Sequence, residues 1–140
     1  MIMKHIVTIW GANFSTEEEL EAFTETLYDD EGDARPSAFL ISIGCSWIDE
    51  DFQELHFFRA EEDRKSFIDY LRLEYSQHQA FVEQLPAAID EAIQAYNAII
   101  LQYGNQSPYG TINEELFRIN KAGLQAVASP VLLACVEYES

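Results

Sequence analysis

The chain has 140 residues, of which 25 are Asp or Glu and 8 are Lys or Arg, so its formal net charge is -17. A field of this sign repels phosphate backbones and attracts basic proteins or cations, which argues against a nucleic-acid ligand. Apolar residues make up 48% of the chain and include nine Phe, seven Tyr and two Trp, a composition that excludes a disordered protein. The acidity also has a simpler explanation, since net charge by itself keeps a protein in solution.

The length of the chain and its N-terminal sequence indicate the number of domains and the cellular compartment. A chain of this length is near the commonest size of one domain, and no linker, repeat or low-complexity tract divides it, so we expect one domain over residues 1–140. The segment Met1–Trp10 carries one Lys and an apolar run broken by His5 and Thr8, which fits neither a signal peptide nor a membrane-spanning helix. We therefore expect a cytoplasmic protein without membrane contact, or one delivered by a route that leaves no mark here.

The chain begins with a predicted strand, a helix and a loop. His5–Trp10 is an apolar, β-branched run that predicts a strand buried on both faces, in the centre of a sheet. Ser15 precedes Glu18 by three residues, the spacing of a capping box, and the apolar residues that follow predict a helix over Thr16–Tyr28. The polar segment Asp29–Pro36 contains Gly and Pro and is typical of a loop.

The next two segments differ in how clearly they can be assigned. Ser37–Ile43 is too short and too apolar for periodicity to separate a strand from a helix, although Pro36 at a first helical position favours a helix. In Phe52–Arg59 the residues alternate between two faces, which predicts the second strand.

The second half is predicted to contain two helical stretches and then a third strand. Asp63–Tyr75 places its apolar residues three and four apart, as a helix does. A further helical stretch is predicted over Gln79–Tyr96, where Pro86 splits or kinks it. Ala98–Tyr103 predicts the third strand, followed by a polar loop through Gly110.

The C-terminal segment completes the predicted fold. Glu114–Asn120 fits no single element, whereas Val131–Tyr138 predicts the last strand, with Leu132, Ala134 and Val136 on one face. The alternation of strands and helices indicates an α+β fold in one domain: a mostly antiparallel or mixed sheet of about four strands with helices packed on it.

The chain carries two dense groups of carboxylates. Either group has the oxygen ligands that Ca²⁺ prefers, but an EF-hand loop requires Gly at its sixth position and Glu at its twelfth. Counted from the first residue of each group, these positions hold Ala34 and Leu40, or Glu54 and Ala60, so the spacing argues against a metal site. The groups are Asp29, Asp30, Glu31 and Asp33, and then Asp49, Glu50, Asp51 and Glu54.

Other chemistry-bearing residues favour no enzyme and no cofactor. Glu54 and His56 are expected on one strand face, where such a pair can move protons or bind a metal, but no third ligand or nucleophile is spaced to join them. Gly44–Trp47 lacks the closing Gly of a nucleophile elbow, and the isolated glycines form no phosphate loop. Cys45 and Cys135 lie in apolar surroundings, which predicts buried thiols.

Trp47 differs from Trp10 in its surroundings, because it stands at the edge of an acidic segment and not inside an apolar run. Trp is enriched at the energetic centres of protein interfaces, so Trp47 is a candidate contact residue. Packing into the core is the alternative, since large aromatic residues often tether loops. Trp10 is expected in the core.

Several short motifs occur in a distinctive order. They are Trp10-Gly11-Ala12-Asn13-Phe14, Ser15-Thr16-Glu17-Glu18-Glu19-Leu20, Tyr28-Asp29 followed by Glu31-Gly32-Asp33, Phe39, and Asp49-Glu50-Asp51-Phe52 with Glu54. Together this set resembles the immunity protein 22 family of bacterial polymorphic toxin systems. The resemblance covers roughly residues 1–60 and is looser through the last two strands.

The resemblance implies a small α+β protein that neutralises a cognate toxin in the cytosol. We expect the acidic segments and Trp47 to dock on a basic toxin surface, such as a nuclease cleft, where carboxylates would occupy the positions of substrate phosphates. An adaptor that binds another basic protein is the alternative, and an acidic hydrolase or metal-dependent enzyme ranks behind both. The expected contact residues are Asp29, Asp30, Glu31, Asp33, Trp47, Asp49, Glu50, Asp51 and Glu54.

Overall fold

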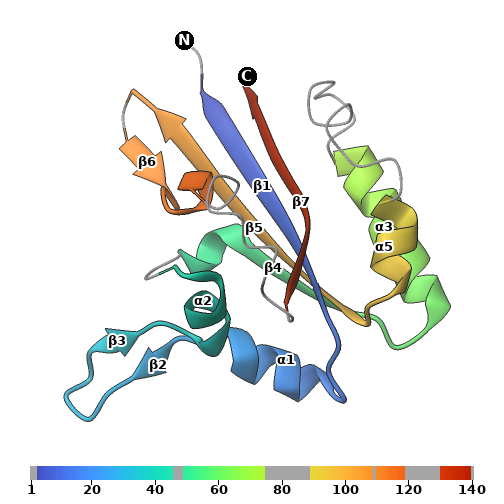
Figure 1. The fold of residues 1–140 in the computed structure, drawn as a ribbon, viewed down its shortest axis with the longest axis horizontal. Helices are drawn as coiled ribbons and strands as arrows, with labels where there is room; N and C mark the ends of the chain where they lie inside the picture. The colour runs from blue at the N-terminus through green and yellow to red at the C-terminus, as the bar shows by residue number, and fades with distance from the viewer. Residues whose placement is uncertain (1–2, 46–48, 75–88, 109, 119–129, 140) are drawn as a thin grey trace.

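A computed structural model describes residues 3–45, 49–74, 89–108, 110–118 and 130–139 (Figure 1). Its main element is an antiparallel sheet in the order β4-β5-β1-β7, with β6 paired to β5. The strands are β1 (Lys4–Ala12), β4 (Gln53–Phe57), β5 (Ala98–Ser107), β6 (Gly110–Ile112) and β7 (Val131–Glu139). The predicted α+β class is confirmed, and β6 adds a strand that the sequence did not reveal.

The first strand lies where its apolar run predicted. β1 pairs with β5 on one side and β7 on the other, and every residue from Ile6 to Ala12 is buried. Alternate side chains of a strand point to opposite faces, so β1 supplies Val7 and Ile9 to one core and Ile6 and Trp10 to the other. The indole Nε1 of Trp10 donates to Thr8 Oγ1 at 3.0 Å, which satisfies its buried N–H group.

Helices cover both faces of the sheet (Figure 1). On the first face, α1 (Glu17–Thr24) and α2 (Ala38–Ile43) contribute Leu20, Phe39 and Ile43 to the core around Trp10. On the second face, α3 (Glu61–Glu74) and α5 (Ile89–Gln94) contribute Phe67, Leu71 and Ile93 to the core around Ile9. We call these the α1–α2 face and the α3–α5 face.

The predicted first helix is shorter and begins one residue later than its capping box suggested. Thr16, not Ser15, is the N-cap, and its Oγ1 accepts from Glu19 N at 3.2 Å. The helix ends at Thr24 because Leu27–Tyr28 forms strand β2, which pairs with β3 (Ala34–Arg35). The predictions of a helix to Tyr28 and of a loop throughout residues 29–36 were therefore wrong. Leu27–Tyr28 and Ala34–Arg35 are instead the two strands of a hairpin.

Helix α2 resolves the ambiguous segment in favour of a helix. Ser37 is the N-cap, with its Oγ accepting from Leu40 N at 3.1 Å, so Pro36 precedes the cap and is not the first helical residue. The helix closes at Gly44, whose φ of 76° is the left-handed conformation that glycine adopts without steric cost. The short 3₁₀ helix η1 (Glu50–Phe52) then leads into β4.

The elements of the second half also differ in detail from their sequence patterns. β5 does not stop at Tyr103 but continues to Ser107, because its polar end pairs with both β1 and β6. The helical stretch expected over Gln79–Tyr96 is described only from residue 89, so the effect of Pro86 lies outside the described residues. The open segment Glu114–Asn120 contains helical residues at 116–118, as far as it is described.

A β-bulge corrects the predicted face of Leu132. β1 pairs Ile9 with Ala134 but Trp10 with Leu132, so β7 holds one extra residue, Leu133, between those two partners. An extra residue shifts the alternation of side chains by one. Leu132 therefore packs on the α1–α2 face, whereas Leu133, Ala134 and Val136 pack on the opposite face.

A reciprocal contact between two loops fastens the start of α1 to the start of β5. Asn97 Oδ1 accepts from Phe14 N at 2.9 Å, and Asn97 Nδ2 donates to Phe14 O at 2.6 Å. Asn13 Oδ1 in turn accepts from Asn97 N at 2.9 Å. These bonds join residues more than 80 positions apart in the chain, so a single side chain closes a long loop.

We predict that Asn97→Ala lowers the free energy of unfolding by about 1–3 kcal/mol, because the Phe14 N–H and C=O groups lose their partner. Urea unfolding followed by circular dichroism measures the change. Gln94→Ala is the matched control, since Gln94 is exposed on the neighbouring helix, and it is expected to stay within about 0.5 kcal/mol of wild type. Equal stability losses in both variants would contradict the role given to Asn97.

Candidate functional site

The first carboxylate group forms the turn of the β2–β3 hairpin, which projects away from the sheet (Figure 1). Asp29 organises this turn: its Oδ1 accepts from the backbone N–H groups of Glu31 and Asp33, both at 2.9 Å. Its Oδ2 accepts from Arg35 Nη2 at 2.9 Å. The hydrogen bond from Asp33 is the main cause that lowers the pKa of Asp29, and those from Glu31 and Arg35 act in the same direction.

The other three acids of the hairpin remain at the surface. Asp30, Glu31 and Asp33 are all exposed, and no ion pair involves them in the part of the chain that the structure describes. Because Asp29 fixes the backbone that carries them, their charges have defined positions. The turn therefore holds one structural carboxylate and three that are available to a partner.

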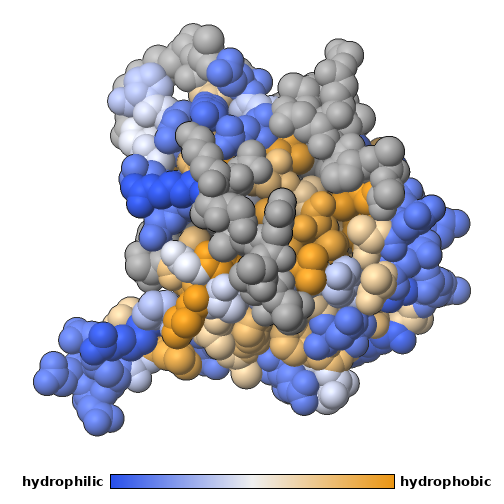
Figure 2. Space-filling view, viewed as in Figure 1, coloured by the Kyte–Doolittle hydropathy of each residue, from blue (hydrophilic) through white to orange (hydrophobic). Residues whose placement is uncertain are grey.

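Exposed apolar side chains precede and follow these acids in the chain. Tyr28, on β2, is 70% exposed, and Leu27 beside it is 48% exposed. Ile41, on α2, is 65% exposed. Figure 2 shows hydrophobic surface where the hairpin leaves the body and hydrophilic surface toward its tip. We call Leu27, Tyr28 and Ile41 with the acids Asp30, Glu31 and Asp33 the hairpin surface.

The second carboxylate group is divided between two environments. Asp49 caps η1, because its Oδ1 accepts from Asp51 N at 3.0 Å, and its own N–H donates to Asn113 Oδ1 at 2.7 Å. Asn113 also donates to Tyr103 O at 2.7 Å, so Asn113 links η1 to the middle of β5. Asp51 is exposed. Glu50 lies in η1, but its side chain and the whole of Trp47 fall outside the described residues.

Glu54 points to the α3–α5 face, where side chains of two other elements, α3 and β5, bind its carboxylate. Its carboxylate accepts from Tyr70 Oη at 3.0 Å and also accepts a hydrogen bond from Tyr103 Oη. His56 Nε2 lies 3.3 Å from Glu54 Oε1, which confirms that the two residues share one strand face. A toxin contact at Glu54 would have to compete with these intramolecular bonds.

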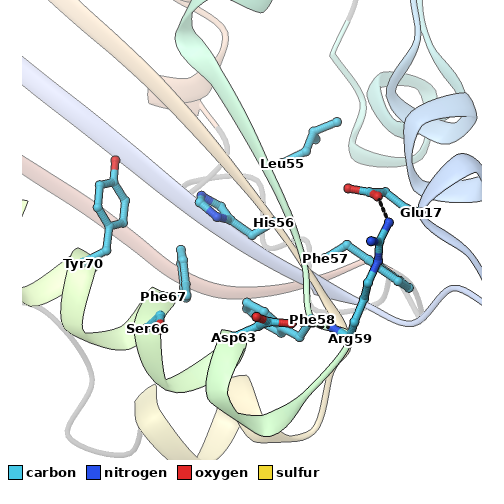
Figure 3. A pocket seen from close by; sticks show the side chains of 10 residues that line it. All are labelled: Glu17, Leu55, His56, Phe57, Phe58, Arg59, Asp63, Ser66, Phe67 and Tyr70. Carbon is cyan, nitrogen blue, oxygen red and sulfur yellow. Dashed lines mark hydrogen bonds and ion pairs between the residues drawn. The ribbon is translucent and has the colours of Figure 1, made fainter.

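His56 borders a cleft of about 480 Å³ between β4 and α3 (Figure 3). The His56 ring packs against Phe67 and Tyr70, with centroids 4.6 and 5.9 Å apart. At the other end of the cleft, Arg59 forms an ion pair with Glu17 of α1. Burial lowers the pKa of His56 and outweighs the opposing effect of Glu54. His56 and Ser66 both line the cleft, but among the described residues no hydrogen bond between His56 and Ser66 is present to activate the hydroxyl.

A second hollow of about 420 Å³ lies between α3 and α5. Its lining includes the ion pair of Arg72 Nη2 with Asp90 Oδ1, at 2.7 Å.

Cys45 is buried, and burial raises the pKa of its thiol to about 11. Such a thiol remains protonated near neutral pH and is a poor nucleophile. The prediction of a buried thiol is confirmed for Cys45, whereas Cys135 is only partly buried.

Most of the Lys and Arg side chains form an ion pair with one neighbouring Asp or Glu, so they do not neutralise the remaining acids. Lys4 pairs with Glu137, Arg64 with Glu61, and Arg118 with Glu114. Arg35, Arg59 and Arg72 also form ion pairs, as described above. Within the described ranges, no group of three or more His, Cys, Asp or Glu side chains is placed to hold a metal ion, and no helix is long and apolar enough to span a membrane.

Sequence reasoning missed the apolar part of the hairpin surface and the partners of Glu54. The predicted helix over Thr16–Tyr28 includes Leu27 and Tyr28, so the sequence did not predict an exposed strand at these two residues. The adjacency of Tyr28 to four acids was the one available signal. Tyr103 lies 49 positions after Glu54, and no local pattern connects such distant residues.

We predict that His56 makes the protein less stable as the pH falls below about 6.5, its ordinary pKa. In that range the unfolded state binds a proton that the folded state resists, so the unfolding free energy decreases with decreasing pH. Urea unfolding between about pH 7 and about pH 5.5 should show a shallower pH dependence for His56→Gln than for wild type. An NMR titration that gave His56 a pKa above 6.5 would contradict the prediction.

Comparison with known proteins gives a result at the level of the family. No curated protein and no solved structure matches the chain. The family model described as immunity protein 22 matches residues 7–126. The match runs from β1 through both helical layers and the β5–β6 hairpin, well beyond the segment on which the sequence resemblance rested. The chain belongs to the immunity protein 22 family.

Proposed function

We propose that this protein binds a cognate bacterial toxin in the cytoplasm and neutralises it by stoichiometric inhibition, without catalysis. The family match supports a toxin as the partner. The observation that carries the mechanism is the set of exposed acids Asp30, Glu31 and Asp33, which have no local counter-charge in the described part of the chain. A single domain comprising the whole chain would act as the inhibitor.

The proposed contact is electrostatic at long range and apolar at short range. The net charge of -17 attracts a basic toxin and raises the association rate, whereas buried apolar contacts supply affinity. The carboxylates of the hairpin, with Asp49, Glu50 and Asp51 around η1, would face the basic surface, and Trp47 and Glu54 are the remaining candidate contacts. If the toxin is a nuclease, these carboxylates would occupy the positions of substrate phosphates, so the inhibitor itself would not bind nucleic acid.

The role can be tested by co-expression in bacteria with a panel of polymorphic toxin domains, of which the cognate one is the domain whose growth inhibition this protein relieves. We predict that wild type restores growth, and that Asp30→Asn with Glu31→Gln and Asp33→Asn protects less well. The loss arises from slower association, which we expect to fall about tenfold at low salt and much less at about 0.5 M salt. Surface plasmon resonance with the purified toxin domain measures these rates.

The matched control changes the same number of exposed acids on α1 and at its C-cap: Glu18→Gln with Glu21→Gln and Glu25→Gln. It alters the net charge equally but leaves the hairpin intact, so its association rate should fall less. Equal effects of the two variants would assign the attraction to net charge alone. Binding without protection from the toxin would favour an adaptor over an immunity protein.

A further inference from the structure

Three of the five large apolar side chains that are exposed in the described residues fall in one short stretch of the chain. Among the described residues, Leu27, Tyr28 and Ile41 are at least 48% exposed and fall within residues 27–41. Leu27 lies opposite Arg35 in the hairpin, and Ser37, two residues further on, caps the helix that carries Ile41. Apolar surface gathered in this way, with a polar border, is characteristic of protein contact sites.

The hairpin presents this apolar surface in a fixed shape. Its strands pair with each other and not with the main sheet. Asp29 holds the turn through two backbone N–H groups and Arg35. A side chain such as Tyr28 on a preorganised hairpin loses little conformational entropy on binding, which favours its use as an anchor.

The charges around this surface determine which kind of partner can bind to it. Three exposed carboxylates border it, Asp30, Glu31 and Asp33, whereas the neighbouring cation Arg35 is already bound to Asp29. A second copy of this chain would bring the same acids against them and be repelled. A partner with an apolar groove and a basic rim would complement both parts of the surface.

We propose that the hairpin surface inserts into an apolar groove with a basic rim on the toxin, with Tyr28 as the central anchor and Leu27 and Ile41 as further apolar contacts. The inference rests on the proposed function and adds the element that makes the contact and the shape of the toxin site. Tyr28 and Ile41 act on the lifetime of the complex, and the three carboxylates act on its rate of formation.

The test measures binding of the purified cognate toxin domain by surface plasmon resonance. Tyr28→Ala is expected to weaken affinity at least about tenfold, mainly through faster dissociation, and Ile41→Ala to weaken it less. Leu73→Ala is the matched control, because Leu73 is 75% exposed but lies on α3, on the other face of the sheet. Circular dichroism melting should be unchanged in all three variants, since the altered side chains are exposed.

The outcomes separate this inference from the function on which it rests. If wild type does not bind the toxin domain, both proposals fail. If wild type binds and protects, but Tyr28→Ala dissociates as slowly as Leu73→Ala, the proposed function stands and the hairpin contact is overturned. Light scattering that shows a wild-type dimer and a Tyr28→Ala monomer, with unchanged toxin affinity, would assign the surface to a second copy and also overturn it.

Discussion

The structure depends on the burial of β1 on both faces of the sheet. Ile6 to Ala12 are buried, and successive side chains enter two separate cores. A strand in this position requires neighbours on both edges and helices on both faces, because its backbone and its side chains both leave water. The pairing with β5 and β7, and the packing of α1 and α3 on opposite sides, follow from that requirement.

The acid excess is accommodated outside these two cores. Burying an unpaired carboxylate is costly, so the charged residues lie on outer helix faces, in turns and at the ends of strands. Local ion pairs such as Arg72 with Asp90 and Lys4 with Glu137 relieve part of the repulsion. With only eight Lys and Arg against 25 acids, repulsion remains, and the hairpin turn carries an uncompensated share of it.

The two carboxylate groups, similar in sequence, have different roles in the structure. Glu54 accepts hydrogen bonds from Tyr70 and Tyr103 and joins β4, β5 and α3. Asp29 and Asp49 hold turns together by accepting backbone N–H groups. Carboxylates bound in this way shape the molecule, whereas exposed acids such as Asp30 and Asp33 can influence a partner.

The sequence by itself determined the elements whose patterns are local: the doubly buried β1, the alternation in β4, the apolar face of α3 and the α+β class. It also located the acidic turn at residues 29–33. Tertiary structure decided the end of α1, the added strand β6 and the bulge at Leu133, because each depends on pairing with a distant or neighbouring strand. For the same reason, only the tertiary structure shows that Glu54 is hydrogen-bonded within the molecule, to a tyrosine 49 positions away. The acids Asp30 and Asp33, near the exposed Tyr28, lie at the surface instead. Hydrophobic period is a property of neighbouring residues, whereas exposure depends on which parts of the chain pack together.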